Sequence, residues 1–96
     1  MKPIVIHPGE ILLEEFMKPL DLNSNALAMA IRVPANRILA IVKGKRAISA
    51  DTALRLARYF GTTPDFWINL QGLHDLKKAE FEAGTQIKRE VRPRAA

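Results

Sequence analysis

Prolines, glycines and polar capping residues divide this sequence into five segments in which apolar residues recur three and four positions apart. This spacing places the apolar side chains of each segment on one face of an α-helix. The five segments span roughly residues 8–18, 23–31, 34–43, 49–60 and 63–84. No pair of alternating segments with a tight turn between them, the signature of a β-hairpin, interrupts this series. The pattern therefore predicts an all-α fold.

The residues at the segment ends suit helix termini. Pro8 and Pro64 stand where the first residue of a helix tolerates proline, and Gly44 and Gly61 stand where a left-handed residue ends a helix. The candidate N-terminal caps are Asn23 or Ser24, Ser49 and Thr63. Gly72 falls inside the fifth segment, which we expect to be one helix with room for a bend at that glycine.

The apolar positions of each segment define the expected core. In the fourth segment we expect Ala53, Leu54, Ala57 and Phe60 to face inward. The 96 residues are enough for one small domain, spanning 1–96. From about residue 85 the chain is poor in apolar residues, so we expect a loose tail for residues 85–96. The alternative is a short strand, carrying Ile87 and Val91, that pairs with residues 2–6.

Charge is distributed unevenly along the chain. Residues 24–60 carry seven basic side chains against one acidic side chain, Asp51, in a protein whose formal net charge is +5. Most runs of charge are solvated faces, but an excess this concentrated favours a surface that binds a polyanion. There is no cysteine, and no apolar run approaches the length of a membrane span or of a signal-peptide core. We therefore expect a cytoplasmic protein without disulfides or membrane contact.

The second and third segments have the form of a helix-turn-helix. Both are short, and the three residues "RVP" separate them. Pro34 disfavours a helical conformation for Val33, which helps to end one helix and begin the next. In the third segment Ile38, Ile41 and Val42 share one face and are expected to point into the core.

The opposite face of the third segment suits the DNA major groove. Asn36, Arg37, Ala40 and Lys43 form an outward stripe. Asparagine can bind adenine, and arginine can bind guanine, through paired hydrogen bonds. Small alanines allow close approach, and cations after the helix can contact phosphates. The predicted DNA-binding residues are Ser24, Ala35, Asn36, Arg37, Ala40, Lys43, Lys45 and Arg46.

The sequence resembles a known family over most of its length. The motifs "VPANRI", "GKRAIS", "TALRLARYFGTTPDFW" and "NLQ", preceded by "HPGEIL", are similar to those of the HigA antitoxins, also called virulence-associated protein I. These belong to the phage-repressor-like (XRE) helix-turn-helix group. The resemblance runs to about Glu82. It implies a five-helix repressor-like fold, a dimer, a palindromic operator in the protein's own promoter, and neutralisation of a HigB-type endoribonuclease toxin.

One position departs from the pattern of repressor-like domains. These usually have glycine in the turn of the helix-turn-helix, where φ is positive, and this sequence has Arg32. Arginine can adopt a left-handed conformation at a cost on the order of 1 kcal/mol. Either Arg32 is left-handed or the turn is wider, so the angle between the two helices stays open at the level of sequence.

Other functions fit the sequence less well. His7 and His74 have no ligand at metal spacing, and no glycine-rich phosphate loop or nucleophile with a local base is present, so we expect no enzyme, cofactor or metal site. The aromatic residues that could stack on RNA bases lie on apolar stripes and are expected in the core or an interface. A repressor without a toxin partner is the strongest alternative.

Dimerisation needs a surface away from the basic stripe. A single recognition helix reads only a few base pairs, and a twofold dimer doubles the readout. The fifth segment supplies the candidates Trp67, Leu70, Leu73 and Phe81, since a chain this short is unable to bury every apolar residue in its own core. The alternative is that Trp67 and Leu70 complete the monomer core and only the later residues reach a partner.

Overall fold

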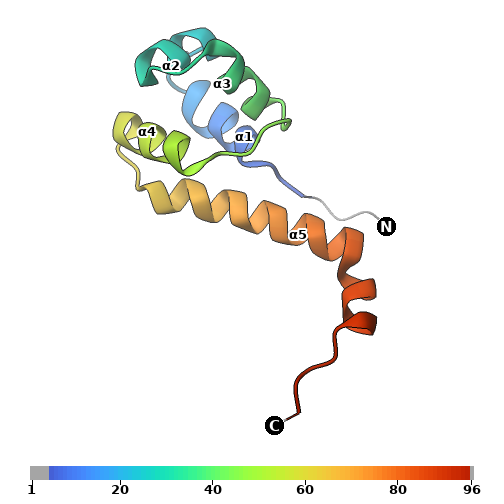
Figure 1. Ribbon diagram of the computed structural model, residues 1–96. Coiled ribbons are helices and arrows are strands. Elements are labelled where there is room, and N and C mark those ends of the chain that lie inside the picture. The colour runs from blue at the N-terminus through green and yellow to red at the C-terminus, as the bar shows by residue number, and fades with distance from the viewer. Residues whose placement is uncertain (1–4, 96) are drawn as a thin grey trace.

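The computed structural model describes residues 5–95 and confirms the all-α fold for this part of the chain, which contains no strand. The α-helices are α1 (Pro8–Ile11), α2 (Ser24–Ile31), α3 (Ala35–Val42), α4 (Ala50–Phe60) and α5 (Pro64–Glu90), and a π-helical segment, η1 (Leu12–Met17), continues α1. Helices α1 to α4 form a compact bundle (Figure 1). Helix α5 runs beneath that bundle and projects beyond it toward the C-terminus.

The predicted helix ends are confirmed, except for the C-terminal end of α5. The Asn23 side chain accepts a hydrogen bond from the Ala26 amide at 2.7 Å, so Asn23, rather than Ser24, caps α2. Ser49 and Thr63 cap α4 and α5 in the same way. Pro8 and Pro64 are the first residues of their helices, and Gly44 and Gly61 have φ values of 73° and 75°. These local signals account for the N-terminal ends of α1, α2, α4 and α5.

The core lies where the helices of the bundle meet α5. Helix α2 packs against α3 and α4, while α5 covers α4 and α1. The fully buried large side chains come from η1, α2, α3 and α4 and from the start of α5: Leu12, Met17, Leu27, Ile38, Ile41, Leu56 and Trp67. One core therefore holds α3 in place, and only one side of that helix is left free.

The predicted inner face of α4 was partly wrong. Ala53 and Ala57 are buried as expected, but Leu54 is 60% exposed, and Leu56 occupies the core instead. Residues 53, 56, 57 and 60 follow the helical period as well as the predicted set does. Only the direction from which α2 and α5 approach α4 selects between the two adjacent faces.

The prediction of a loose tail or strand from about residue 85 was also wrong for residues 85–90, which form the end of α5. The Gln86 side chain donates to the Glu90 carboxylate one turn later, and Lys88 and Arg89 lie in the last turn, where cations favour a helix. Residues 91–95 have no regular structure, and residues 2–4 of the segment 2–6 that was expected to pair as a strand lie outside the described residues. Helix α5 continues through Gly72, and its last turns, near the C-terminus, change direction (Figure 1).

Candidate nucleic-acid interface

The turn between α2 and α3 contains a left-handed arginine. Arg32 has φ 62° and ψ 49°, so the first of the two geometries left open by the sequence is confirmed. The Val33 amide donates to the Ala28 carbonyl at 3.0 Å and the Arg32 amide to the Met29 carbonyl at 3.3 Å, which closes the end of α2. Pro34 is extended, and α3 starts at the next residue. The chain therefore reverses direction tightly enough to form a helix-turn-helix.

Arg55 of α4 braces this turn. Its guanidinium donates to the Ile31 carbonyl oxygen at 2.9 Å and to the Arg32 carbonyl oxygen at 3.3 Å. Its Nε donates to the Asp51 carboxylate at 2.7 Å, one turn earlier on α4. These bonds satisfy carbonyl groups that the end of α2 leaves without helical partners. Sequence reasoning missed this role, because residues 31 and 55 are far apart in the chain.

Helix α3 has one buried and one exposed face. Ile38 and Ile41 are fully buried, as predicted, while Asn36, Lys43 and Ala35 are exposed. Ala40 is partly exposed on the same side. The structure adds Leu39, which is 44% exposed and lies three positions after Asn36. The sequence analysis assigned Leu39 to neither face of the helix.

Arg37 differs from the other residues of the predicted stripe. Only 25% of its side chain is exposed, and its guanidinium Nη1 lies 3.8 Å from a carboxylate oxygen of Asp51. Its Nε is buried and has no hydrogen-bond partner among the described residues. In this conformation Arg37 packs toward the start of α4, and it needs to move away from Asp51 to present its full donor set outward.

The basic residues that follow α3 are all exposed. Lys43 is the C-terminal cap residue of α3, Gly44 is left-handed, and Lys45 and Arg46 lie in the connection to α4. The last of the predicted DNA-binding residues, Ser24, is the first residue of α2 and is half-buried. The C-terminal end of α3 thus presents three cations with no acidic residue between them.

The loop that carries these cations is anchored to α5. The Gln71 side chain accepts a hydrogen bond from the Ile48 amide at 2.8 Å and donates to the Asp75 carboxylate at 2.9 Å. Gln71 is buried, so its polar atoms need these partners. The hydrogen bond from Ile48 to Gln71 fixes the C-terminal end of the connection between α3 and α4 against α5.

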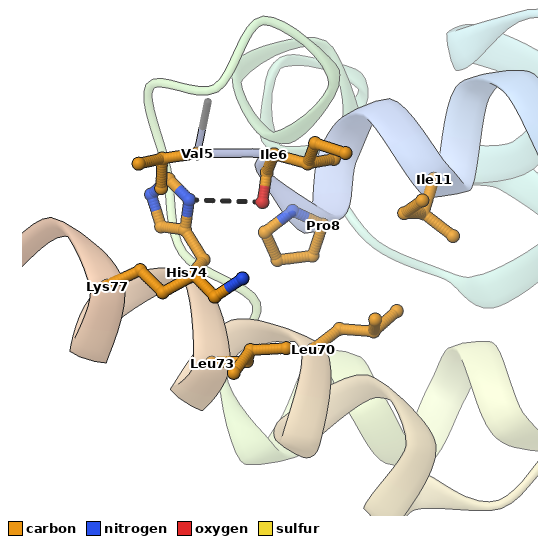
Figure 2. A pocket seen from close by; sticks show the side chains of 8 residues that line it. All are labelled: Val5, Ile6, Pro8, Ile11, Leu70, Leu73, His74 and Lys77. Carbon is orange, nitrogen blue, oxygen red and sulfur yellow. Dashed lines mark hydrogen bonds between the residues drawn. The ribbon is translucent and has the colours of Figure 1, made fainter. Parts of the chain in front are cut away.

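A small cavity separates the N-terminal residues from α5. Its volume is about 190 Å³, and Figure 2 shows the side chains that line it. They are mostly apolar: Val5, Ile6, Pro8, Ile11, Leu70, Leu73, His74 and Lys77. The His74 ring nitrogen Nδ1 lies 3.2 Å from the Ile6 carbonyl oxygen, which is the dashed contact in Figure 2. The cavity holds no cluster of groups that would perform chemistry.

His7 lies beside this cavity and caps α1. Its Nδ1 accepts a hydrogen bond from the Gly9 amide at 2.9 Å, and its ring contacts the His74 ring edge-on with centroids 4.8 Å apart. Burial lowers the pKa of His7, the positive charges of His74 and Lys78 lower it further, and Asp75 opposes them. The lowered pKa favours the neutral ring, the form in which Nδ1 accepts the hydrogen bond that caps α1.

The candidate dimer residues divide into two groups. Trp67 is fully buried, and its indole Nε1 donates to the Thr62 hydroxyl at 2.8 Å, which favours the alternative that Trp67 completes the monomer core over a role in an interface. Its ring packs against Phe16 of η1 and Phe60 of α4, with ring centroids 4.9 Å and 6.5 Å away. Leu70 packs against the core. Leu73 and Phe81 are 53% and 51% exposed and stay available to a partner.

Two negative findings limit the alternatives. Within residues 5–95, no three His, Asp or Glu side chains converge as a metal site would require. In the same part of the chain, no helix combines the length and apolar composition needed to cross a bilayer.

A helix-turn-helix family model, HTH_3, matches residues 13–67. The chain is 56% identical over 75 residues to virulence-associated protein I of Dichelobacter nodosus, an alignment that covers 78% of this chain and 69% of the relative. Among solved structures it is similar to the Pseudomonas aeruginosa antitoxin HigA with the higBA promoter, at 46% identity and a TM-score of 0.93. That match covers 96% of this chain and all of the other.

A second solved structure, the antitoxin GraA in complex with its operator, is 44% identical and has a TM-score of 0.91. It covers 100% of this chain, and the match includes 95% of the GraA chain. The arrangement of helices described above is therefore shared with chains whose structures contain DNA.

Proposed function

Because this chain belongs to the helix-turn-helix family, as the match over residues 13–67 and the 56% identical relative establish, we propose that it is a DNA-binding antitoxin. It binds an operator in its own promoter as a dimer, represses that promoter, and neutralises a HigB-type ribonuclease toxin. The cytoplasm, where bacterial operator DNA and messenger RNA occur, is its place of action.

The exposed face of α3 is the observation that carries the proposal. Asn36 is positioned to form paired hydrogen bonds with an adenine in the major groove. The side chains of Ala35 and Ala40 are small, so the backbone of α3 is able to come close to the base edges. Arg37 reads a guanine after it leaves Asp51.

Phosphate contacts hold the protein in register on the DNA. Lys43, Lys45 and Arg46 follow α3 and are exposed, which suits contacts to the strand beside the groove. Ser24 lies at the N-terminus of α2, where free amide groups favour a phosphate. Each cation that neutralises a phosphate releases a counterion, so the affinity is expected to fall steeply with salt.

Similarity to chains solved with DNA supports this assignment. A HigA antitoxin that is 46% identical to this chain was solved with its promoter, and an antitoxin that is 44% identical was solved with its operator. Both superpose over nearly the full length of this chain. Chains of this fold are therefore able to bind a DNA duplex.

A twofold dimer suits a palindromic operator. Two copies of α3 separated by one turn of DNA, roughly 34 Å, would read two half-sites. Leu73 and Phe81 are the interface candidates, because both are large, apolar and more than half exposed on α5. Leu70 contributes only where its partly buried side chain reaches the surface.

DNA binding is tested by footprinting the region upstream of the coding sequence and by measuring affinity in gel-shift titrations. A protected sequence with twofold symmetry, bound at least a thousandfold more tightly than scrambled DNA, is the expected result. Equal affinity for both DNAs would contradict operator recognition.

The toxin partner is tested separately by coexpression with the adjacent reading frame. An antitoxin copurifies with the product of that frame and relieves the growth arrest it causes. A repressor without a toxin partner is the alternative, since the surface of α3 serves either protein equally well. Operator binding without copurification or rescue would favour that alternative.

A further inference from the structure

Leu39 is an exposed apolar residue at the centre of the proposed DNA-reading face. It is 44% exposed, whereas its neighbours Ile38 and Ile41 are fully buried. It lies three positions after Asn36 and four before Lys43, so these three side chains follow one another along the outer side of α3. Among the described residues, Leu39 is the only large apolar side chain of α3 that is exposed.

Leu39 is not among the residues that pack α3 onto the rest of the protein. The core contacts of α3 are made by Ile38 and Ile41, and the close contact with α1 is made by the backbone of Ile41 and Val42. Single exposed leucines are common on protein surfaces and need no explanation by themselves. Leu39, however, lies between the amide of Asn36 and the cations Lys43, Lys45 and Arg46. At such a place an apolar side chain has a definite chemical counterpart in DNA.

That counterpart is the C5-methyl group of thymine. The major groove is lined with hydrogen-bond donors and acceptors, and the thymine methyl is the apolar group that it presents. A leucine side chain neither donates nor accepts a hydrogen bond, so covering a cytosine amino group would leave that donor unpaired at a cost. Leucine therefore favours thymine, whose methyl group it contacts, and disfavours cytosine, whose amino group it would leave without a hydrogen-bond acceptor.

We propose that Leu39 is a specificity-determining residue that reads a thymine C5-methyl group in the operator. The inference rests on the proposed DNA-binding function and deepens it. Asn36 and Leu39 together would favour adjacent A·T pairs, because the amide reads an adenine and the leucine reads a thymine. The adjacent alanines, Ala35 and Ala40, leave space for the methyl group beside Leu39.

The test removes one methyl group at a time. The footprinted operator is synthesised with deoxyuridine in place of each thymine in turn, which deletes the C5-methyl and keeps the base pairing. At one thymine per half-site, the parent protein is expected to lose roughly three- to fivefold in affinity, the effect of exposing one buried methyl. The Leu39→Ala variant should bind the thymine and deoxyuridine operators equally at that position.

A matched control separates readout from a general loss of apolar surface. Leu54 is also exposed, at 60%, but lies on α4, so the Leu54→Ala variant should keep the full sensitivity to deoxyuridine. Sedimentation of Leu39→Ala should match that of the parent, which removes assembly as a cause. Placing 5-methylcytosine opposite guanine at the same position should restore part of the affinity that a cytosine loses.

The outcomes distinguish this inference from the proposed function. If the parent protein prefers its operator to scrambled DNA but no deoxyuridine changes its affinity in a way that depends on Leu39, the methyl readout is overturned and DNA recognition stands. If the parent shows no preference for the operator, the proposed function itself fails. Equal losses for Leu39→Ala and the parent at every thymine would also overturn the inference.

Discussion

Gly9 lies directly against the carbonyl oxygen of Ile41. A β-carbon on residue 9 would come within 1.8 Å of that oxygen and 3.0 Å of the Val42 α-carbon. Both neighbours are backbone atoms of α3, so they are unable to rotate away as a flexible side chain would. This contact sets how closely α3 packs on α1, and only glycine fits there.

The substitution Gly9→Ala is expected to destabilise the protein by at least about 1–3 kcal/mol, the usual range for an overpacked site. Urea unfolding followed by circular dichroism measures this change. Gly72→Ala is the matched control, because a β-carbon there meets nothing within 4 Å and alanine favours a helix interior by about 1 kcal/mol. The two glycines should therefore respond in opposite directions. A Gly9→Ala protein as stable as the parent would contradict the close contact.

Arg32 allows a second test based on backbone geometry. With φ at 62°, Arg32→Gly should be about 1 kcal/mol or more stable than Arg32→Ala, since glycine alone adopts this conformation without steric cost. Both variants lack the arginine side chain, so the comparison isolates the backbone. Urea unfolding of the pair gives the difference.

Met29 supplies the control for that comparison. It is an exposed residue inside α2, so Met29→Gly should be less stable than Met29→Ala by about 1 kcal/mol. The alanine variant should thus be the more stable of the pair at position 29, and the glycine variant the more stable at position 32. The same sign at both positions would show that the turn is not left-handed in solution.

The sequence predicted the local structure well because the signals for helix ends are local. Asn23, Ser49 and Thr63 cap their helices through hydrogen bonds to amides only three residues away. Periodicity also identified Ile38 and Ile41 as core. These features depend on neighbours in the sequence and can therefore be predicted without the fold.

Features that depend on neighbours in space were missed. The choice between Leu54 and Leu56 as the core residue of α4 depends on how the other helices approach it. The sequence also left open whether Trp67 lies in the monomer core or in an interface, and the fold places it in the core. The brace from Arg55 to the carbonyl of Ile31 likewise joins parts of the chain that only the fold brings together. Such contacts carry no pattern that a single sequence reveals.

Stability is expected to fall as the pH is lowered toward 5. Burial and the charges of His74 and Lys78 lower the pKa of His7 in the folded protein. In the unfolded chain the His7 side chain keeps its ordinary pKa of about 6.5. The unfolded state then binds more protons in this range, so stability is full above about pH 6.5 and is lost as the pH falls through the folded-state pKa. Urea midpoints at pH 7.5 and about pH 5 measure the effect.

His7→Asn serves as the control for this prediction. Asparagine keeps an acceptor that can cap α1 but does not titrate, so the variant should show a smaller difference between the two pH values. His74 faces His7, and Asp75 and Lys78 act on it from α5, so these residues are left unchanged in both proteins. An unchanged pH dependence in His7→Asn would assign the effect to other groups.

Arg37→Ala is expected to lower operator affinity by about 1–3 kcal/mol and to relax the preference at one base pair. The position of Arg37 beside Asp51 adds a second possibility that the same experiment resolves. If Arg37 only positions α3, the variant will weaken binding to operator and scrambled DNA alike and will keep the preference at every base pair. A gel-shift titration with single-base-pair operator variants separates these outcomes.

Lys45→Ala provides the contrasting pattern. Lys45 is exposed after α3 and is expected to contact a phosphate, so its loss should weaken binding to all DNA sequences. The slope of log affinity against log salt should fall by about one unit. A change in base preference for Lys45→Ala would mean that the connection after α3 enters the groove.

Replacing Leu73 or Phe81 with glutamate is expected to dissociate the proposed dimer, because each substitution places a charge on an apolar surface that a partner would cover. Sedimentation at micromolar concentration should change from dimer to monomer, and operator affinity should fall because the two half-sites are no longer read together. Leu20→Glu is the control, since Leu20 is 59% exposed but lies in the connection between η1 and α2. A parent protein that is monomeric, and whose footprint lacks twofold symmetry, would remove the dimer and leave the toxin as the expected partner of this part of α5.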